Sequence, residues 1–206
     1  MLSLLTALPS TSYTHRTYVV SSGDAFSASK AADFESQLLS KYPFSTKSLT
    51  ASGTPREYGN YDIATVPRAR KIHQPLWSTP FSCLWCLVAC LRVLVSRPED
   101  YEPPKEWPHA YPALILTNGP ATGLIVVTSA LLLRFLGLRG TEADGWSGMR
   151  SVFVESWARV RKLSLSGRII VAAGLCERVV VQWEALVPKG DGNNVGRTEF
   201  VGALVR

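Results

Sequence analysis

The residues best suited to hold an anion lie in a turn, Thr117-Asn118-Gly119-Pro120-Ala121-Thr122-Gly123, between two apolar runs. The first turn of a helix presents backbone N–H groups without intrahelical partners at the positive end of the helix dipole. Glycine lets a ligand approach the backbone, and Thr122 can cap the helix. The turn predicts a cradle for a phosphate or diphosphate, made by Asn118, Gly119, Pro120, Ala121, Thr122 and Gly123. The alternative is a tight strand-to-helix turn that needs glycine only for its shape.

Two further polar turns, Ser21-Ser22-Gly23-Asp24 and Glu155-Ser156, also follow expected strands. In open α/β sheets such turns gather at the carboxyl edge, where ligands bind. Asp24 and Glu155 would be a catalytic pair in one interpretation. In the other, which we favour, Asp24 caps the next helix and Glu155 has a structural, hydrogen-bonding role, because no base or nucleophile at a special spacing supports chemistry. We expect no catalytic residue, and an anion site that includes Ser21, Ser22, Gly23, Glu155 and Ser156.

The four cysteines do not form a disulfide framework or a convincing metal site. Cys83, Cys86 and Cys90 lie at helical spacing in FSCLWCLVACL, and Cys176 is far away in the sequence. Cys83 and Cys86 form a CxxC pair. A zinc or redox site would need a second such pair or nearby histidines, and His73 and His109 lie outside this helix. We expect small buried apolar side chains in a reducing compartment and no bound metal.

An aromatic helix is expected over Pro75–Ser96, with Trp77, Phe81 and Trp85 on a wide apolar face. Basic residues flank it, with Arg68, Arg70 and Lys71 before it and Arg92 and Arg97 after it. Such flanks suit a helix that lies in a lipid headgroup layer. The alternative is a core-packed helix with a solvated polar side. We expect membrane contact over residues 75–97 because two Trp and one Phe exceed what one small sheet must cover, the contacts being Trp77, Phe81, Trp85, Arg70 and Lys71.

The composition is that of a basic, folded chain of 206 residues. Its apolar fraction of 46% and charged fraction of 18% exclude global disorder. Lys and Arg exceed Asp and Glu by 22 − 16 = +6, which favours anionic partners. No Lys/Arg run indicates a nucleic-acid-binding arm, so no nucleic-acid partner is expected. Prolines in Pro75–Leu91 and the Asn118-Gly119-Pro120 break in Ala110–Leu133 argue against a membrane-spanning helix.

Strand and helix patterns alternate along the chain. The expected strands are Arg16–Ser21, Asp62–Val66, Ala113–Thr117, Ser151–Glu155 and Arg178–Trp183. The other expected helices are Ser27–Tyr42, Thr122–Leu136 and Ser164–Leu175. A Pro-rich linker is expected over 97–112 and a Gly/Asn-rich loop from 187. This alternation predicts an α/β fold with a Rossmann-like, doubly wound parallel sheet.

With these motifs in view, the chain resembles the anchoring subunit of the eukaryotic two-subunit enzyme that adds the second GlcNAc to GlcNAc-diphosphodolichol (asparagine-linked glycosylation, member fourteen). The matching stretches span most of Arg16–Leu186, and they are RTYVVSSGDAFSASKA, IATVPRAR, TNGPATG, VFVESWARVRKLSLSGRII and VVVQWEAL. The final GRTEFVGALVR is similar to filamentous-fungal members.

The resemblance implies the N-terminal, acceptor-side half of a split GT-B glycosyltransferase over residues 1–186. It implies no cofactor, no UDP-sugar site and no activity without a separate catalytic subunit. That subunit would be held at the cytosolic face of the endoplasmic reticulum, and by family resemblance also at the outer nuclear membrane. The acceptor would be dolichol-diphosphate-GlcNAc. We expect residues 187–206 to dock the partner, with Trp183, Phe200, Val201 and Leu204 as apolar anchors.

Two features depart from the resemblance. Family members begin with a transmembrane helix, a strand and a GSGGHT-type loop, whereas MLSLL looks like the helix after that loop. We therefore expect the fold to lack its first strand, which in the order 3-2-1-4-5 lies between the second and fourth. VPKGDGNN is an insertion before the tail. The alternative function is a free-standing Rossmann-like nucleotide-binding protein, which the absence of GxGxxG with a following ribose-binding acid weakens.

Overall fold

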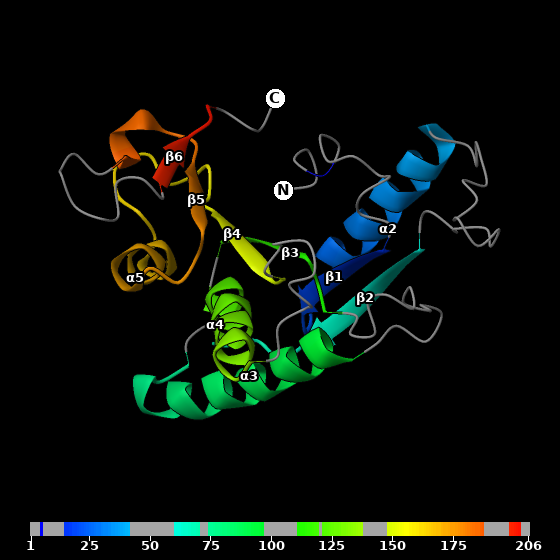
Figure 1. Ribbon diagram of the computed structural model, residues 1–206, viewed down its shortest axis with the longest axis horizontal. Helices are drawn as coiled ribbons and strands as arrows, with labels where there is room; N and C mark the ends of the chain where they lie inside the picture. The colour runs from blue at the N-terminus through cyan, green and yellow to red at the C-terminus, as the bar shows by residue number, and fades with distance from the viewer. Residues whose placement is uncertain are drawn as a thin grey trace. The chain divides into compact units, whose positions relative to one another are not determined.

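The computed structural model is an α/β structure in which every strand pairing is parallel (Figure 1). It divides into two compact units, residues 2–66 and 67–206, which are described separately below. The residues that the structure describes are 5, 15–41, 60–70, 74–96, 111–119, 121–137, 148–187 and 198–202.

The unit 2–66 is a strand–helix–strand crossover. β1 (His15–Ser21) pairs in parallel with β2 (Asn60–Val66), from His15 beside Asn60 to Ser21 beside Val66. α2 (Ala25–Lys41) connects them and contacts both strands. Its apolar side is buried at Ala31 and Phe34, as the helical spacing of the sequence predicts. Residues 42–59, between α2 and β2, lie outside the described residues.

The unit 67–206 contains a four-stranded parallel sheet in the order β3-β4-β5-β6. Its strands are β3 (Leu114–Asn118), β4 (Arg150–Val154), β5 (Arg178–Val181) and β6 (Thr198–Phe200). α4 (Ala121–Phe135) joins β3 to β4, and α5 (Leu165–Ala173) joins β4 to β5. One core cluster holds these elements together because Val127 of α4 and Ile170 of α5 are buried with Phe153 of β4.

α3 (Thr79–Val95) precedes this sheet and packs along α4 (Figure 1). A short 3-10 helix, η1 (Leu76–Ser78), takes the place of the first turn expected from Pro75. Pro80 then stands in the opening turn of α3, where its missing N–H costs no intrahelical hydrogen bond. The expected Pro-rich linker over 97–112 lies outside the described residues, apart from residues 111 and 112.

The element order agrees with the sequence-based expectation except at the C-terminal end. Residues 198–200 form β6, the outer strand of the sheet, whereas the sequence indicated only a docking tail there. A second 3-10 helix, η3 (Glu184–Leu186), follows β5. The expected division at residue 186 and the expected absence of a first strand stay predictions.

Candidate functional site

The turn between β3 and α4 has the open form that an anion cradle needs. Asn118 ends β3, Gly119 follows with a φ of +74°, and α4 begins at Ala121. A left-handed φ of this kind favours glycine. A Cβ added at Gly119 would meet no atom within 4 Å, so the space beside its Cα is unoccupied. Pro120 lies outside the described residues. The turn thus brings accessible backbone to the positive end of α4.

Gly123 has a packing role in the same turn. A Cβ at this position would lie 3.4 Å from the backbone oxygen of Asn118 and 3.4 Å from Cβ of Thr117. Thr117 is buried, and its Oγ1 has no hydrogen-bond partner among the described residues. The glycine therefore lets the first turn of α4 lie close against the end of β3, as the packing alternative for this motif predicts.

Glu155 follows β4 at the same edge of the sheet. Asn118 is beside Val154 in the β3–β4 register, so Gly119 and Glu155 both begin loops at this edge. Glu155 is 1% exposed. Its Oε1 accepts a hydrogen bond from the N–H of Ser156 at 2.9 Å, and its Oε2 accepts two from Ser164, from N–H and from Oγ, both at 2.9 Å. The carboxylate thus accepts hydrogen bonds from the first residue of loop 156–163 and from the residue that follows the loop.

The start of α5 continues this network. Ser164 is the N-cap, and its Oγ accepts a hydrogen bond from the N–H of Gly167 at 3.0 Å. A Cβ at Gly167 would overlap Oε2 of Glu155, so only glycine leaves room for the carboxylate. Gln182 donates its side-chain N–H to the backbone oxygen of Glu155 at 3.1 Å. Glu155 therefore has the hydrogen-bonding role of the second interpretation.

Asp24 has a capping role in the other unit. Its Oδ1 accepts a hydrogen bond from the N–H of Ser27 at 3.0 Å, and its Oδ2 accepts one from the Ser27 hydroxyl at 2.7 Å. The turn before it has Gly23 at a φ of +77°, and the N–H of Ser22 donates to the oxygen of Val66 at 2.7 Å. That Ser21, Ser22 and Gly23 belong to an anion site stays a prediction.

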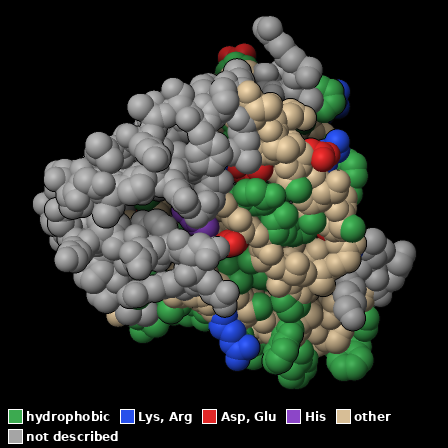
Figure 2. All heavy atoms as spheres, turned by 90° about the vertical axis from the view of Figure 1, so that its right-hand side faces the viewer, with side chains coloured by type: hydrophobic (Ala, Val, Ile, Leu, Met, Phe, Trp, Pro, Cys, Tyr) green, Lys and Arg blue, Asp and Glu red, His purple; other side chains and the backbone are tan. Residues whose placement is uncertain are grey.

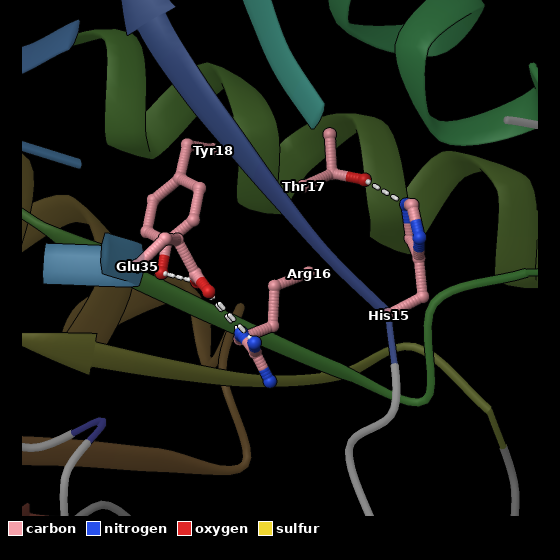
Figure 3. Close-up of polar contacts among 5 residues, drawn as sticks. All are labelled: His15, Arg16, Thr17, Tyr18 and Glu35. Atoms are coloured by element: carbon pink, nitrogen blue, oxygen red, sulfur yellow. Dashed lines mark hydrogen bonds and ion pairs between the residues drawn. The ribbon is translucent and has the colours of Figure 1, made fainter. Parts of the chain in front are cut away.

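A buried polar cluster between β1 and α2 was not predicted from the sequence (Figure 3). Glu35 is fully buried, and Arg16 donates to it from Nε and from a terminal nitrogen, each at 2.7 Å. The Tyr18 hydroxyl donates to the same carboxylate at 2.5 Å. The hydrogen bond to Glu35 raises the pKa of Arg16. Burial, and then the hydrogen bond to Glu35, raise the pKa of Tyr18.

Comparison with known proteins identifies the family. A family profile described as "Oligosaccharide biosynthesis protein Alg14 like" matches residues 1–204. The chain belongs to the Alg14-like family. It is 38% identical to the UDP-N-acetylglucosamine transferase subunit alg14 of Aspergillus fumigatus, over 96% of this chain and 95% of that protein. The subunits of the same name from Schizosaccharomyces pombe and Homo sapiens are 34% and 32% identical, over 99% and 92% of this chain and 76% and 71% of theirs. No solved structure matches the chain.

In this Alg14-like chain, α3 has its largest apolar side chains on the outside. Trp77, just before the helix, is 79% exposed, and Phe81 and Trp85 are 74% and 66% exposed. The buried residues of α3 are instead Cys86, Cys90 and Leu94. Figure 2 shows hydrophobic side chains along the lower edge of that view, where Figure 1 places α3. Within the described residues, none of the helices has both the length and the apolar character needed to cross a bilayer.

The cysteines of the Alg14-like chain are free. Cys86 and Cys90 pack with their sulfur atoms 4.0 Å apart, and this contact raises the pKa of Cys90, with burial adding to it. Burial raises the pKa of Cys176 to about 11. Cys86, Cys90 and Cys176 are buried, as expected, whereas Cys83 is only half-buried because it lies nearer the exposed side of α3. The described part of the chain has no group of metal-ligating residues.

The residues expected to dock a partner fall into three groups. Trp183 packs on Trp157, with ring centroids 5.7 Å apart, and its Nε1–H donates to the Trp157 oxygen at 2.8 Å. Trp183 is therefore engaged within its own unit. Phe200 and Val201 are 47% and 45% exposed at the outer strand β6. Leu204 lies outside the described residues, as does Lys71 of the expected membrane contact.

Proposed function

We propose that this protein is the acceptor-side, non-catalytic subunit of a UDP-GlcNAc transferase that acts in N-glycan precursor synthesis. In this proposal it binds dolichol-diphosphate-GlcNAc, and a separate catalytic subunit transfers the second GlcNAc. The observation that carries the proposal is the open turn at Gly119, which meets the start of α4 at the carboxyl edge of a parallel sheet. The names of the relatives support the part of the proposal that makes this chain a subunit of a UDP-GlcNAc transferase.

The acceptor would bind through its diphosphate. Backbone N–H groups in the first turn of α4 and the helix dipole favour negative charge beside Gly119. Neither carboxylate first considered for catalysis supports chemistry, because Glu155 is buried in hydrogen bonds and Asp24 caps α2. The chemical step would therefore fall to the partner, as in the donor half of a split GT-B enzyme.

Membrane contact would come from α3. An apolar side chain gains about 1.5–3 kcal/mol when it leaves water completely. A helix that exposes Phe81 and Trp85 while it buries two cysteines forgoes this gain unless another apolar phase covers it. Arg70 before the helix and Arg92 in its last turn would add attraction to anionic headgroups. We extend the proposal to the cytosolic face of the endoplasmic reticulum and the outer nuclear membrane.

Partner binding would use the outer strand of the sheet. Phe200 and Val201 form an exposed apolar pair on and just after β6, and aromatic anchors of this kind commonly dominate binding. Trp183 is a weaker candidate than the sequence suggested because Trp157 already covers part of it.

The experiment is a reconstitution in three arms with radiolabelled UDP-GlcNAc and GlcNAc-diphosphate-polyprenol. The arms hold this chain, the catalytic subunit, or both, in vesicles. We expect transfer only with both, and we expect the catalytic subunit to sediment with vesicles only when this chain is present. Phe200→Asp should weaken that co-sedimentation, while Phe26→Asp, at a still more exposed Phe of α2, should not.

Transfer by this chain alone would overturn the non-catalytic assignment. Transfer by the catalytic subunit at an undiminished rate without this chain would overturn the acceptor-side assignment. Equal loss of co-sedimentation in the Phe200 and Phe26 variants would remove β6 as the docking surface.

A further inference from the structure

The loop that follows β4, residues 156–163, concentrates positive charge at the carboxyl edge of the four-stranded sheet. Arg159, Arg161 and Lys162 are all exposed. Their side chains form no ion pair with another described residue. No Asp or Glu occurs between Ser156 and Cys176. The positive charge of this loop is therefore not neutralised by any acidic residue within the loop or in the helix that follows it.

The same loop is held in one shape from several sides. Glu155 binds its first residue and the residue after its last, through Ser156 and Ser164. In its middle, the N–H of Arg159 donates to the oxygen of Ser156 at 3.0 Å. The Trp157 oxygen accepts from the indole of Trp183 at 2.8 Å. A ligand that binds the loop would find its backbone already ordered, which lowers the entropic cost of binding.

The loop supplies what the neighbouring turn lacks. Residues 117–123 offer backbone N–H groups but contain no Lys or Arg. The β3–β4 register places the start of the basic loop at the edge where that turn begins. A diphosphate carries several negative charges, and arginine binds phosphate oxygens in a bidentate way. Together the two segments would supply both the backbone N–H groups and the positive charge that a diphosphate site uses.

We propose that loop 156–163 contacts the diphosphate of the acceptor through Arg159, Arg161 and Lys162, and that Glu155 is the positioning residue that sets the loop. This inference rests on the proposed function and names further binding residues for the same site. Glu155 itself does not touch the anion, because it is 1% exposed and carries the same sign of charge. It acts through the hydrogen bonds that fix Ser156 and Ser164.

The test uses the complex of the full chain with its catalytic subunit. Initial rates are measured against the concentration of GlcNAc-diphosphate on a short-chain polyprenol in detergent micelles. The triple variant Arg159→Gln/Arg161→Gln/Lys162→Gln should raise the KM for this acceptor about tenfold, with kcat and the KM for UDP-GlcNAc unchanged. Arg159→Lys with Arg161→Lys keeps the charge but loses the bidentate hydrogen bonds, so its acceptor KM should lie between those of the wild type and the triple variant. Arg178→Gln, an exposed cation at the opposite edge of the sheet, is the matched control.

The positioning role is tested with a matched pair of buried or half-buried carboxylates. Glu155→Gln places an amide N–H where Ser156 or Ser164 needs an acceptor, so the acceptor KM should rise. Glu177→Gln breaks a similar pair of hydrogen bonds, from N–H and Oγ of Ser151, at the amino edge of the sheet. It should lower the melting temperature without changing the KM. If Glu155→Gln does not fold, Ser164→Ala removes one of the three hydrogen bonds and is expected to change the KM in the same direction.

Inorganic pyrophosphate distinguishes the sources of the anion. It should compete with the acceptor in the wild-type complex and compete less in the triple variant. An unchanged acceptor KM in the triple variant overturns the inference. It does so even if the variant loses inhibition by pyrophosphate, because the loop would then bind a free anion and not the acceptor. It also does so if the variant loses binding to anionic vesicles without acceptor, because the loop would then bind lipid headgroups. A raised KM for UDP-GlcNAc would also overturn it. If the wild-type complex transfers no GlcNAc, the proposed function itself fails, and that outcome is separate from an active complex whose variants keep a normal KM.

Discussion

Ser164 donates two hydrogen bonds to one oxygen of Glu155, from its backbone N–H and from its hydroxyl, both at 2.9 Å. Glu177 repeats the arrangement at the other end of β4, where Oε2 accepts from the N–H of Ser151 at 2.6 Å and from its Oγ at 2.9 Å. β4 thus has a carboxylate–serine contact at each end. The one at the carboxyl edge orders the loop beside the candidate site. The one at the amino edge joins β4 to the start of β5, and to α4 through the ion pair of Glu177 with Arg134.

Gly167→Ala should lower the stability of the chain, although alanine is the better helix former. In an ordinary helix interior this change raises stability by about 0.5–1 kcal/mol. Here the added Cβ overlaps Oε2 of Glu155, so we expect a loss of roughly 1–3 kcal/mol. Urea unfolding measures whether the substitution raises or lowers the free energy of unfolding. Ala172→Gly, at an exposed position of the same helix, should cost about 1 kcal/mol through propensity alone. A more stable Gly167→Ala variant would show that the carboxylate moves aside freely.

Glu177 should make stability depend on pH. Burial raises its pKa, but the hydrogen bonds from Ser151 and Arg134 outweigh burial, so the pKa lies below its usual 4.5. A lowered carboxyl pKa stabilises the folded state above the unfolded pKa, and this stabilisation is lost as the pH falls through the folded value. Melting temperatures between pH 7 and pH 3 should fall less steeply for Glu177→Gln than for wild type. Parallel curves would contradict this role of Glu177.

Leaving Glu35 without its cation should lower the free energy of unfolding more than replacing both charged residues does. Arg16→Met leaves a buried carboxylate without its cation, with an expected loss of about 3–5 kcal/mol. The double variant Arg16→Met/Glu35→Leu should recover part of that loss, because neither charge is then buried. Chemical denaturation of both single variants and the double variant measures the coupling. Additive losses would mean that the bidentate contact contributes nothing of its own.

Phe81→Glu should weaken binding to anionic vesicles, and Phe26→Glu should not. The two phenylalanines are 74% and 72% exposed, so the substitutions match in residue type, charge and exposure. Only Phe81 lies on the aromatic face of α3. Binding should also weaken as salt screens the basic flanks. Vesicle co-sedimentation measures both effects, and equal losses in the two variants would indicate a general charge effect.

The elements of regular structure were predictable because each has a clear period or composition. The apolar run of β3, the helical spacing of α2 and the apolar α4 all lie within a few residues of their expected positions. β6 was missed because its three residues, in GRTEFVG, are too few to show an alternating pattern, and only pairing with β5 makes them a strand.

The polar contacts were less predictable because they depend on residues far apart in the sequence. Glu35 looks like a solvated charge on an amphipathic helix until β1 brings Arg16 and Tyr18 to it. The available signal was the alternation of Arg16 and Tyr18, which places both on one face of the strand. For Glu155 the hydrogen-bonding interpretation was available from the sequence, but its partner Ser164, across the whole loop, was not.

In the proposed function, this chain binds the acceptor and its catalytic partner binds the donor. The most direct measurement is a calorimetric titration of the full chain, without the catalytic subunit, with GlcNAc-diphosphate on a short-chain polyprenol and separately with UDP-GlcNAc. We expect saturable binding of the acceptor, weakened by Gly119→Val at the open turn, and no saturable binding of UDP-GlcNAc. Saturable binding of UDP-GlcNAc with no binding of the acceptor would contradict it.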